Sequence, residues 1–281
     1  MNNHQKLLDI NKNGFLKDKL IIDEKFEDFA NFVKSYALIK DSKRERSGYS
    51  NDIYDDLPIE SKNYVKNLAL EILKKNEWIK KYINLPRLLN IQVLKTGFDE
   101  NASDNPTHAM LWHRDTDDLY HHLKVQIPLH KIKKENGIFS CAKKTICSIN
   151  HKLVDKKLYE KSMKEEDDYK ASDKIRVSDQ VMYNHFNDKI LDFECDISDI
   201  LFVDTNYCYH RGGLILEPGL TRNLITITYG GITHELNDYF KDKVFNKKNF
   251  IKKFVARSLR FSRKKLLEFK GGVRHIPIVL D

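Results

Sequence analysis

The chain has 281 residues, of which 41% are hydrophobic and 11% aromatic, and it contains only 11 Gly and 6 Pro. This composition excludes a disordered chain, and the length favours a single domain spanning residues 1–281. No run of about 18 apolar residues and no leader-like segment is present, so we expect a soluble, cytoplasmic protein.

The net charge of +8 is concentrated near the end of the chain. Residues 241–270 hold twelve Lys or Arg against Asp242 and Glu268, together with apolar residues near helical spacing. We interpret the basic extension 235–281 as a helix docked on the domain, with contact to an anionic membrane surface or an acidic partner as the alternative. A nucleic-acid partner is disfavoured because no recognised nucleic-acid module accompanies the charge.

Apolar residues at spacings of three and four predict two amphipathic helices in the first third of the chain. In residues 23–39 these positions are Phe26, Phe29, Ala30, Val33 and Ala37. In residues 58–83, which open at Pro58, they are Val65, Leu68, Ala69, Ile72 and Leu73. We therefore expect residues 1–87 to form a helical N-terminal part that precedes the strands.

From residue 88 onward the apolar period changes to two, which is typical of β-strands. The β-rich runs cover residues 87–95, 122–129, 189–197, 199–204 and 222–230. Because no helical pattern separates most of these runs, they predict an antiparallel sandwich or barrel and hence an α+β fold. The core covers residues 88–234, with a charged, helical insertion at 151–175.

The tripeptide His113-Arg114-Asp115 matches part of a kinase catalytic loop. That loop also needs an Asn five residues after the Asp, a downstream D-F-G and an upstream glycine-rich loop. Residue 120 is Tyr, and the sequence holds neither of the other two elements. The kinase interpretation is therefore excluded.

A metal site is the second interpretation of this tripeptide. On an extended segment His113 and Asp115 point to the same side, so both can bind one cation. His210 follows another β-rich run and offers a third ligand. Two imidazoles and one carboxylate leave three open positions on an octahedral ion, as in non-haem Fe(II) oxygenases. The alternatives are a hydrogen-bonded His-Asp pair at a strand end and a histidine satisfied within the core.

Four segments of the sequence occur in the same order as their counterparts in a known family. They are INKNGFLKDKLIIDEKFEDF, WHRDTDD, LKVQIPLHKIKKENGIF and DILFVDTNYCYHRGG, and an Arg follows about a dozen residues after the last His. In this order they resemble the Fe(II)/2-oxoglutarate-dependent dioxygenases of the phytanoyl-CoA dioxygenase type. The resemblance covers roughly residues 8–231 and is most specific in the two segments that carry the candidate ligands.

The resemblance implies a double-stranded β-helix of the jelly-roll or cupin type, with the N-terminal helices packed on one sheet. It also implies that His113, Asp115 and His210 bind Fe(II) and form the catalytic centre. Arg222 would bind the distal carboxylate of the cosubstrate 2-oxoglutarate, and O2 would take the remaining metal position. A surface role for Arg222 is the plain alternative.

The chain also departs from the family pattern. A Pro-Gly-Ser-His turn usually follows the position of ENGIFS, whereas this chain continues as CAKKTICSINH into the charged insertion. Some relatives carry a hydroxyl at the position of Gly212 that helps to hold the cosubstrate. Halogenating relatives replace the carboxylate ligand with a small residue, so Asp115 favours hydroxylation.

Strand alternation assigns two faces to residues 122–129 and 222–230, one apolar and one polar. The polar faces are expected to line the lumen that holds metal and cosubstrate, while the apolar faces pack on the helices. Lys124 and Gln92 are thus candidate cosubstrate contacts. For Lys124, a lysine that protects a sheet edge is an equally good interpretation.

Two functions remain open. The first is an Fe(II)- and 2-oxoglutarate-dependent hydroxylase that acts on a small-molecule, carrier-, lipid- or sugar-linked metabolite and releases succinate and CO2. The second is a non-catalytic β-barrel that binds an anionic ligand or a membrane surface. A zinc hydrolase is disfavoured because the sequence supplies no dedicated general base. No motif identifies the substrate.

Overall fold

The computed structural model describes residues 1–37, 50–100, 110–115, 121–143 and 176–233. The basic extension 235–281 and the charged insertion 151–175 lie outside these ranges, so the predictions made for them are not addressed. None of the helices in the described ranges is long and apolar enough to cross a membrane.

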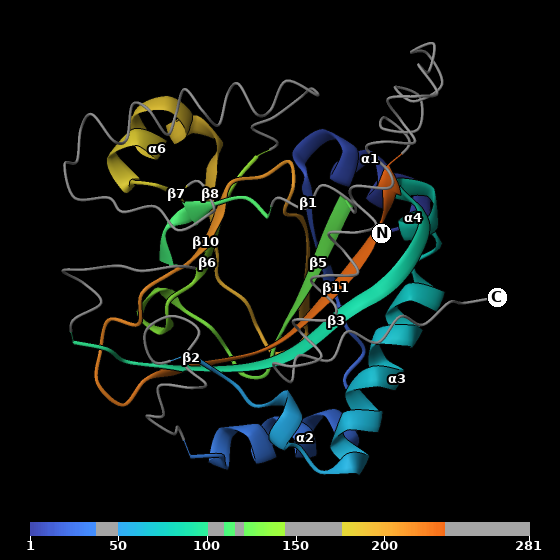
Figure 1. The fold of residues 1–281 in the computed structure, drawn as a ribbon, viewed down its shortest axis with the longest axis vertical. Helices are drawn as coiled ribbons and strands as arrows, with labels where there is room; N and C mark the ends of the chain where they lie inside the picture. Colours follow the sequence, from blue (N-terminus) through green and yellow to red (C-terminus); the bar gives the residue numbers. More distant parts are fainter. Residues whose placement is uncertain (38–49, 101–109, 116–120, 144–175, 234–281) are drawn as a thin grey trace, which may run out of the picture.

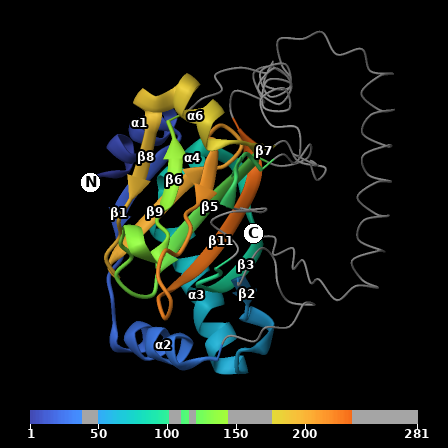
Figure 2. The same ribbon diagram turned by 90° about the vertical axis from the view of Figure 1, so that its left-hand side faces the viewer.

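The described strands form two antiparallel sheets (Figures 1 and 2), as predicted from β-rich runs with no helical pattern between most of them. The larger sheet has the order β1 (Phe15–Lys19), β9 (Asp199–Asp204), β5 (His121–Pro128), β11 (Thr221–Thr233), β3 (Ile83–Gly97) and β2 (Ser50–Asp52). The smaller sheet has the order β7 (Arg176–Val177), β4 (Trp112–His113), β10 (His210–Gly212), β6 (Phe139–Ala142) and β8 (Ile190–Phe193). Residues of β6 and β8 pack against Leu201 and Val203 of β9, so the two sheets face each other.

Within the residues that the structure describes, four α-helices belong to the first third of the chain, and one more precedes β8. They are α1 (Asn3–Asn13), α2 (Glu24–Ser35), α3 (Ile59–Lys75), α4 (Glu77–Tyr82) and α6 (Asp179–Phe186). Short 3-10 helices cover Tyr54–Asp56, Lys134–Asn136 and Asn187–Lys189. In Figure 1, α2 and α3 lie beside β3 on the outer side of the larger sheet, whereas α6 lies beside the smaller sheet.

The predicted helix at 23–39 forms, but it ends early. The Asp23 side chain caps its start by accepting a hydrogen bond from the Phe26 N–H at 2.9 Å. At its other end, the buried Lys95 side chain donates to the carbonyls of Lys34 (2.8 Å) and Val33 (3.3 Å) and to that of Tyr36. Because this side chain satisfies the final carbonyls, the helix ends at Ser35. Ala37 therefore lies beyond the helix and is exposed, contrary to its predicted core position.

The predicted helix at 58–83 is divided at Asn76 into α3 and α4. Asn76 has φ −109° and ψ 71°, outside the helical region. Its side chain donates to the Ile72 carbonyl at 2.9 Å and accepts from Trp78 Nε1 at 3.0 Å. An asparagine side chain competes with the helix ladder for backbone partners, which explains the break.

Residues 1–87 are also less uniformly helical than predicted. They contain β1, which pairs with β9, and β2, which pairs with β3. Gly14, at φ 78°, ends α1 and turns the chain into β1. Both strands are short and lie at the edges of the sheet. In β1 the apolar residues Phe15 and Leu16 are adjacent rather than alternating, and β2 has none, so neither strand shows the apolar alternation that identifies interior strands.

The two faces of the larger sheet differ as the alternation predicted. Val125, Ile127, Ile225 and Ile227 join the apolar cluster formed by the N-terminal helices, and all four are fully buried. The polar residues of the same strands face the smaller sheet instead. The helices therefore cover one side of the sheet, and the other side is left to form a site between the two sheets.

Candidate metal centre

The two candidate histidines meet across the smaller sheet. His113 at the end of β4 and His210 at the start of β10 are antiparallel partners. Their ring centroids lie 4.3 Å apart, and both residues are buried. Phe139, from the neighbouring strand β6, stacks against His210 with a centroid distance of 5.7 Å.

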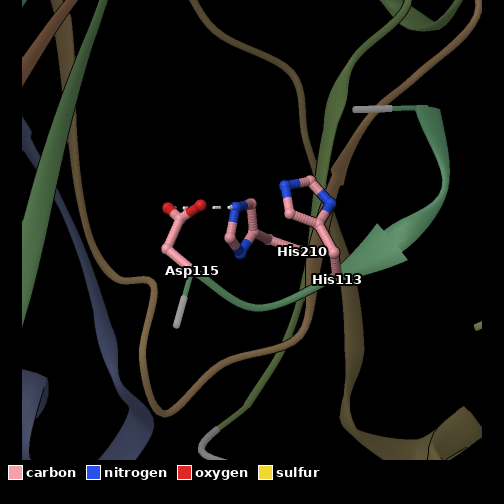
Figure 3. Close-up of side chains that lie close together, drawn as sticks. All are labelled: His113, Asp115 and His210. Atoms are coloured by element: carbon pink, nitrogen blue, oxygen red, sulfur yellow. Dashed lines mark ion pairs between the residues drawn. The ribbon is translucent and has the colours of Figure 1, made fainter. Parts of the chain in front are cut away.

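Asp115 reaches the histidines from a loop. The prediction placed His113 and Asp115 on one extended segment, but β4 ends at His113. The Asp115 N–H instead donates to the Thr205 carbonyl at 2.9 Å, which ties it to the turn that follows β9. Its Oδ2 lies 3.8 Å from His210 Nε2 (Figure 3).

Each of His113, Asp115 and His210 offers one ligand atom, and these atoms lie within 4.8 Å of one another. Within the described ranges, this is the one group of three His, Cys, Asp or Glu side chains with such spacing. All three residues are buried. The structure thus brings together the three side chains predicted as ligands.

Backbone carbonyls orient both imidazole rings. His113 Nδ1 lies 2.8 Å from the Leu111 carbonyl, and His210 Nδ1 lies 3.2 Å from the Cys208 carbonyl. A carbonyl oxygen only accepts hydrogen bonds, so Nδ1 carries the proton in both rings and Nε2 has the lone pair. Protein ligands of metal ions are commonly oriented by such contacts.

Lys124 contacts the carboxylate of this group, with its Nζ 2.6 Å from Asp115 Oδ2. Burial alone would raise the pKa of the Asp115 carboxyl. The charge of Lys124, together with the interactions of His210 and His113, outweighs that effect and holds the pKa well below its usual value. The carboxylate is therefore ionised in its buried position.

Lys124 lies on β5, which has β9 on one side and β11 on the other. The interpretation of Lys124 as a lysine at a sheet edge is therefore wrong. The alternation alone could not exclude it, because strand order is set by pairings between segments that are distant in sequence. Lys124 is in register with Thr228 of the neighbouring strand β11, and both residues lie on the lumen face.

Gln92 also lies on the lumen face, in register with Thr226 of β11, which pairs in turn with Gln126 of β5. Its Nε2 donates to Asp52 Oδ2 at 3.0 Å. The contact found for this amide is thus with β2 rather than with the three clustered side chains.

Arg222 extends toward the strand that carries His210. Its Nη1 donates to the carbonyls of Gly213, at 2.9 Å, and Gly137. A Cβ built on Gly212 would lie 2.9 Å from Arg222 Nη2, so the guanidinium occupies the space beside that glycine. Burial lowers the pKa of Arg222 to about 10, which keeps it charged at neutral pH.

A small cavity separates Arg222 from the ring that stacks on His210. Its volume is about 20 Å³, enough for roughly one water molecule. Gln126 and Arg222 line it from the larger sheet, while Phe139 and Phe193 line it from the smaller sheet. A fixed cation and an apolar wall therefore meet beside the ring that stacks on His210.

Sequence reasoning missed Asp179, at the start of α6. Its Oδ1 accepts a hydrogen bond from Trp112 Nε1 at 2.7 Å and also contacts Arg211 Nη1. The Arg211 guanidinium lies over the Trp112 ring, 4.9 Å from its centroid. Trp112 precedes His113 in β4, and Arg211 follows His210 in β10. The carboxylate of Asp179 therefore links the two strands that carry these histidines. Strand alternation could have signalled that these neighbours point away from the metal centre, but not which residue they meet.

A second buried group supports the turn that holds Asp115. Asp204, at the end of β9, contacts the Tyr82 hydroxyl and lies 2.5 Å from His121 Nε2. Its other oxygen accepts from the N–H groups of Asn206 and Tyr207, each at 3.1 Å. These bonds fix the turn whose Thr205 carbonyl binds Asp115. Burial and the Asp204 charge raise the pKa of Tyr82, so its hydroxyl stays protonated as a donor.

Comparison with known proteins finds similarity at the level of structure. No protein-family model and no curated protein sequence matches the chain. HygX from Streptomyces hygroscopicus, with nickel and 2-oxoglutarate bound, is 15% identical over 81% of this chain and 86% of its own, with a TM-score of 0.51. The epimerase SnoN, in complex with Fe3+, α-ketoglutarate (2-oxoglutarate) and nogalamycin RO, is 12% identical over 82% and 83%, with a TM-score of 0.52.

A third similar structure is SnoK, a non-haem α-ketoglutarate-dependent carbocyclase from nogalamycin biosynthesis. It is 13% identical over 81% of this chain and 83% of its own, with a TM-score of 0.50. At such identities the similarity establishes the fold alone. The chain therefore shares its fold with enzymes that depend on a metal ion and 2-oxoglutarate.

Proposed function

We propose that this chain is an Fe(II)- and 2-oxoglutarate-dependent oxygenase whose metal ligands are His113, Asp115 and His210. The observation that carries the proposal is the convergence of these three buried side chains within 4.8 Å. We further interpret the two facing sheets as a double-stranded β-helix of the phytanoyl-CoA dioxygenase type. The sequence resemblance and the shared fold support this interpretation.

The donor set fits ferrous iron. Two neutral imidazoles and one carboxylate form the facial set that leaves three positions open for cosubstrate and O2. A structural zinc site usually has four protein ligands and often includes Cys, whereas magnesium and calcium prefer sites built from oxygen donors. Because Nδ1 carries the proton in both His113 and His210, the Nε2 atom of each ring has the lone pair that can bind a metal ion.

Arg222 is the proposed partner of the distal 2-oxoglutarate carboxylate, and Lys124 and Gln92 are further candidate contacts. A guanidinium presents two parallel N–H groups to a carboxylate, which suits a dianionic cosubstrate. When bound, Fe(II) with 2-oxoglutarate and O2 supplies the oxidising chemistry, and succinate and CO2 are released. The crystal structures of HygX and SnoN with this cosubstrate support its assignment here.

The side chains of the protein would bind and orient the substrate and the cosubstrate, and they would exclude water from the site. Phe139 stacks on His210 and lines the cavity beside Arg222, so it limits water between the metal centre and the cation. The Asp115 carboxylate, which is the ligand that halogenating relatives lack, favours hydroxylation of an unactivated C–H bond. HygX was crystallised with hygromycin B and SnoN with nogalamycin RO, which supports a small-molecule substrate, whether free or linked to a carrier, lipid or sugar.

Anaerobic titration of the full chain with Fe(II) and 2-oxoglutarate tests this proposal. We expect a visible charge-transfer band that needs both components, and succinate formation once O2 is admitted. His210→Ala and Asp115→Asn should abolish both signals. His4→Ala and Asp188→Asn change exposed residues of the same types and should retain them. A wild-type chain that binds 2-oxoglutarate without metal would instead support the non-catalytic binding protein.

A further inference from the structure

Lys124 forms an ion pair with the Asp115 oxygen that also lies near His210. Its Nζ lies 2.6 Å from Asp115 Oδ2, and the same oxygen lies 3.8 Å from His210 Nε2. The side chains of Lys124 and Asp115 are only 23% and 11% exposed. This ion pair is therefore weakly screened by solvent, unlike a pair on the surface.

The net charge of the site is the same in two states and higher in a third. In the structure, the ammonium of Lys124 offsets the carboxylate of Asp115, and the buried Arg222 guanidinium leaves one net positive charge. A divalent cation on its own would add two further positive charges. A dianionic cosubstrate would return the net charge to its starting value. A buried excess charge is costly unless it is paired, so the state with metal alone is disfavoured.

Lys124 has a position from which it can change partners. Its flexible side chain leaves the centre of the larger sheet on the lumen face, in register with Thr228. Gln126, two residues along the same face, lines the cavity beside Arg222. Lys124 therefore projects from the same face of the sheet as Gln126 and Arg222, so an anion bound beside Arg222 would offer its ammonium a second partner.

Building on the proposed function, we propose that Lys124 is an exchangeable counter-ion of Asp115 that opposes binding of the metal alone and couples metal binding to binding of the dianionic cosubstrate. Coupling between two ligands is reciprocal, so the cosubstrate strengthens metal binding by the same factor that the metal strengthens cosubstrate binding. Lysine on this face thus makes the protein discriminate between a free metal ion and one accompanied by 2-oxoglutarate.

The test compares the full wild-type chain with Lys124→Met, which keeps length but removes charge, and with Lys124→Arg, which keeps charge. The affinity for Mn(II) is measured anaerobically by calorimetry, with and without 2-oxoglutarate. In Lys124→Met we expect the affinity for Mn(II) alone to rise at least about tenfold, and the enhancement by 2-oxoglutarate to shrink toward one. Lys124→Arg should keep the weak metal binding and the coupling of the wild type.

Thermal unfolding supplies a second readout. Lys124→Met removes an ammonium from a buried carboxylate, so the metal-free variant should unfold at a lower temperature and gain more from Mn(II) than the wild type. Lys131→Met is the control, because Lys131 is an exposed lysine in a longer ion pair with Asp196, at 3.5 Å. That variant should match the wild type in every measurement.

The outcomes separate the two proposals. If wild type and Lys124→Met bind Mn(II) alone equally, or the variant binds it more weakly, the counter-ion role is wrong while the metal site stands. Unchanged coupling in Lys124→Met would likewise refute the role. If neither protein binds Mn(II), with or without 2-oxoglutarate, the proposed function itself fails.

Discussion

His113 and His210 are direct partners on adjacent antiparallel strands, with ring centroids 4.3 Å apart. The strands that carry them are short, since β4 has two residues and β10 has three. Because such short strands form few backbone hydrogen bonds, the pairing holds them in place only weakly. The spacing of the two imidazoles must therefore depend on contacts outside the pairing.

Asp179 provides such a contact, because it binds both Trp112 and Arg211. In Asp179→Ala, we expect the affinity for Mn(II) to fall by about tenfold, as is typical when an outer partner of a metal site is lost. The free energy of unfolding should fall by about 1–2 kcal/mol as two hydrogen bonds are removed. Asp188→Ala, an exposed carboxylate from the same region, should change neither quantity. Loss of stability with unchanged metal affinity would limit Asp179 to a purely structural role.

Gly212 leaves room for the Arg222 guanidinium. A Cβ at this position would lie 2.9 Å from Nη2, so in Gly212→Ala the guanidinium must move. If Arg222 binds the cosubstrate, 2-oxoglutarate affinity should decrease by roughly tenfold, because a bidentate contact needs exact placement of both N–H groups. Calorimetry should show Mn(II) affinity unchanged, since Gly212 supplies no ligand. Unaltered 2-oxoglutarate affinity would argue against Arg222 as its partner.

Lys95 should contribute to stability through the end of α2. In Lys95→Met, the carbonyls of Val33, Lys34 and Tyr36 lose a charged donor in a buried position. We expect the free energy of unfolding in urea to decrease by about 1–3 kcal/mol. Lys34→Met removes an exposed lysine from the same helix and should have little effect. Equal stabilities of the two variants would contradict this capping role.

Cys195 should show a pH dependence that differs from that of an unfolded thiol. Burial raises its pKa from 9.0 to about 11, so the folded protein keeps a proton that the unfolded chain loses between these values. Its contribution to stability is therefore complete below pH 9.0 and decreases as the pH rises toward 11. Alkylation of the native thiol, followed by mass spectrometry, should keep accelerating above pH 9.0, whereas in the urea-unfolded chain it should level off. A native profile that levels off near pH 9.0 would disprove the shift.

Much of the larger sheet could be predicted from the sequence. Alternation in residues 122–129 and 222–230 assigned Val125 and Ile227 to the core face and Lys124 to the lumen face, as found. The same reasoning failed for β1 and β2, because these short edge strands have no alternation of apolar and polar residues. It also missed the break at Asn76, because a single side chain that binds Ile72 outweighs a helical pattern.

The sequence by itself determined which residues are candidate metal ligands and which face of each long strand is apolar, because side-chain alternation is a local property of an extended chain. Only the tertiary structure decided that His113 pairs with His210, that Thr205 holds Asp115 and that Lys124 lies in the middle of a sheet rather than at its edge. These relationships join segments separated by scores of residues. They are set by strand order and packing, which no local pattern encodes.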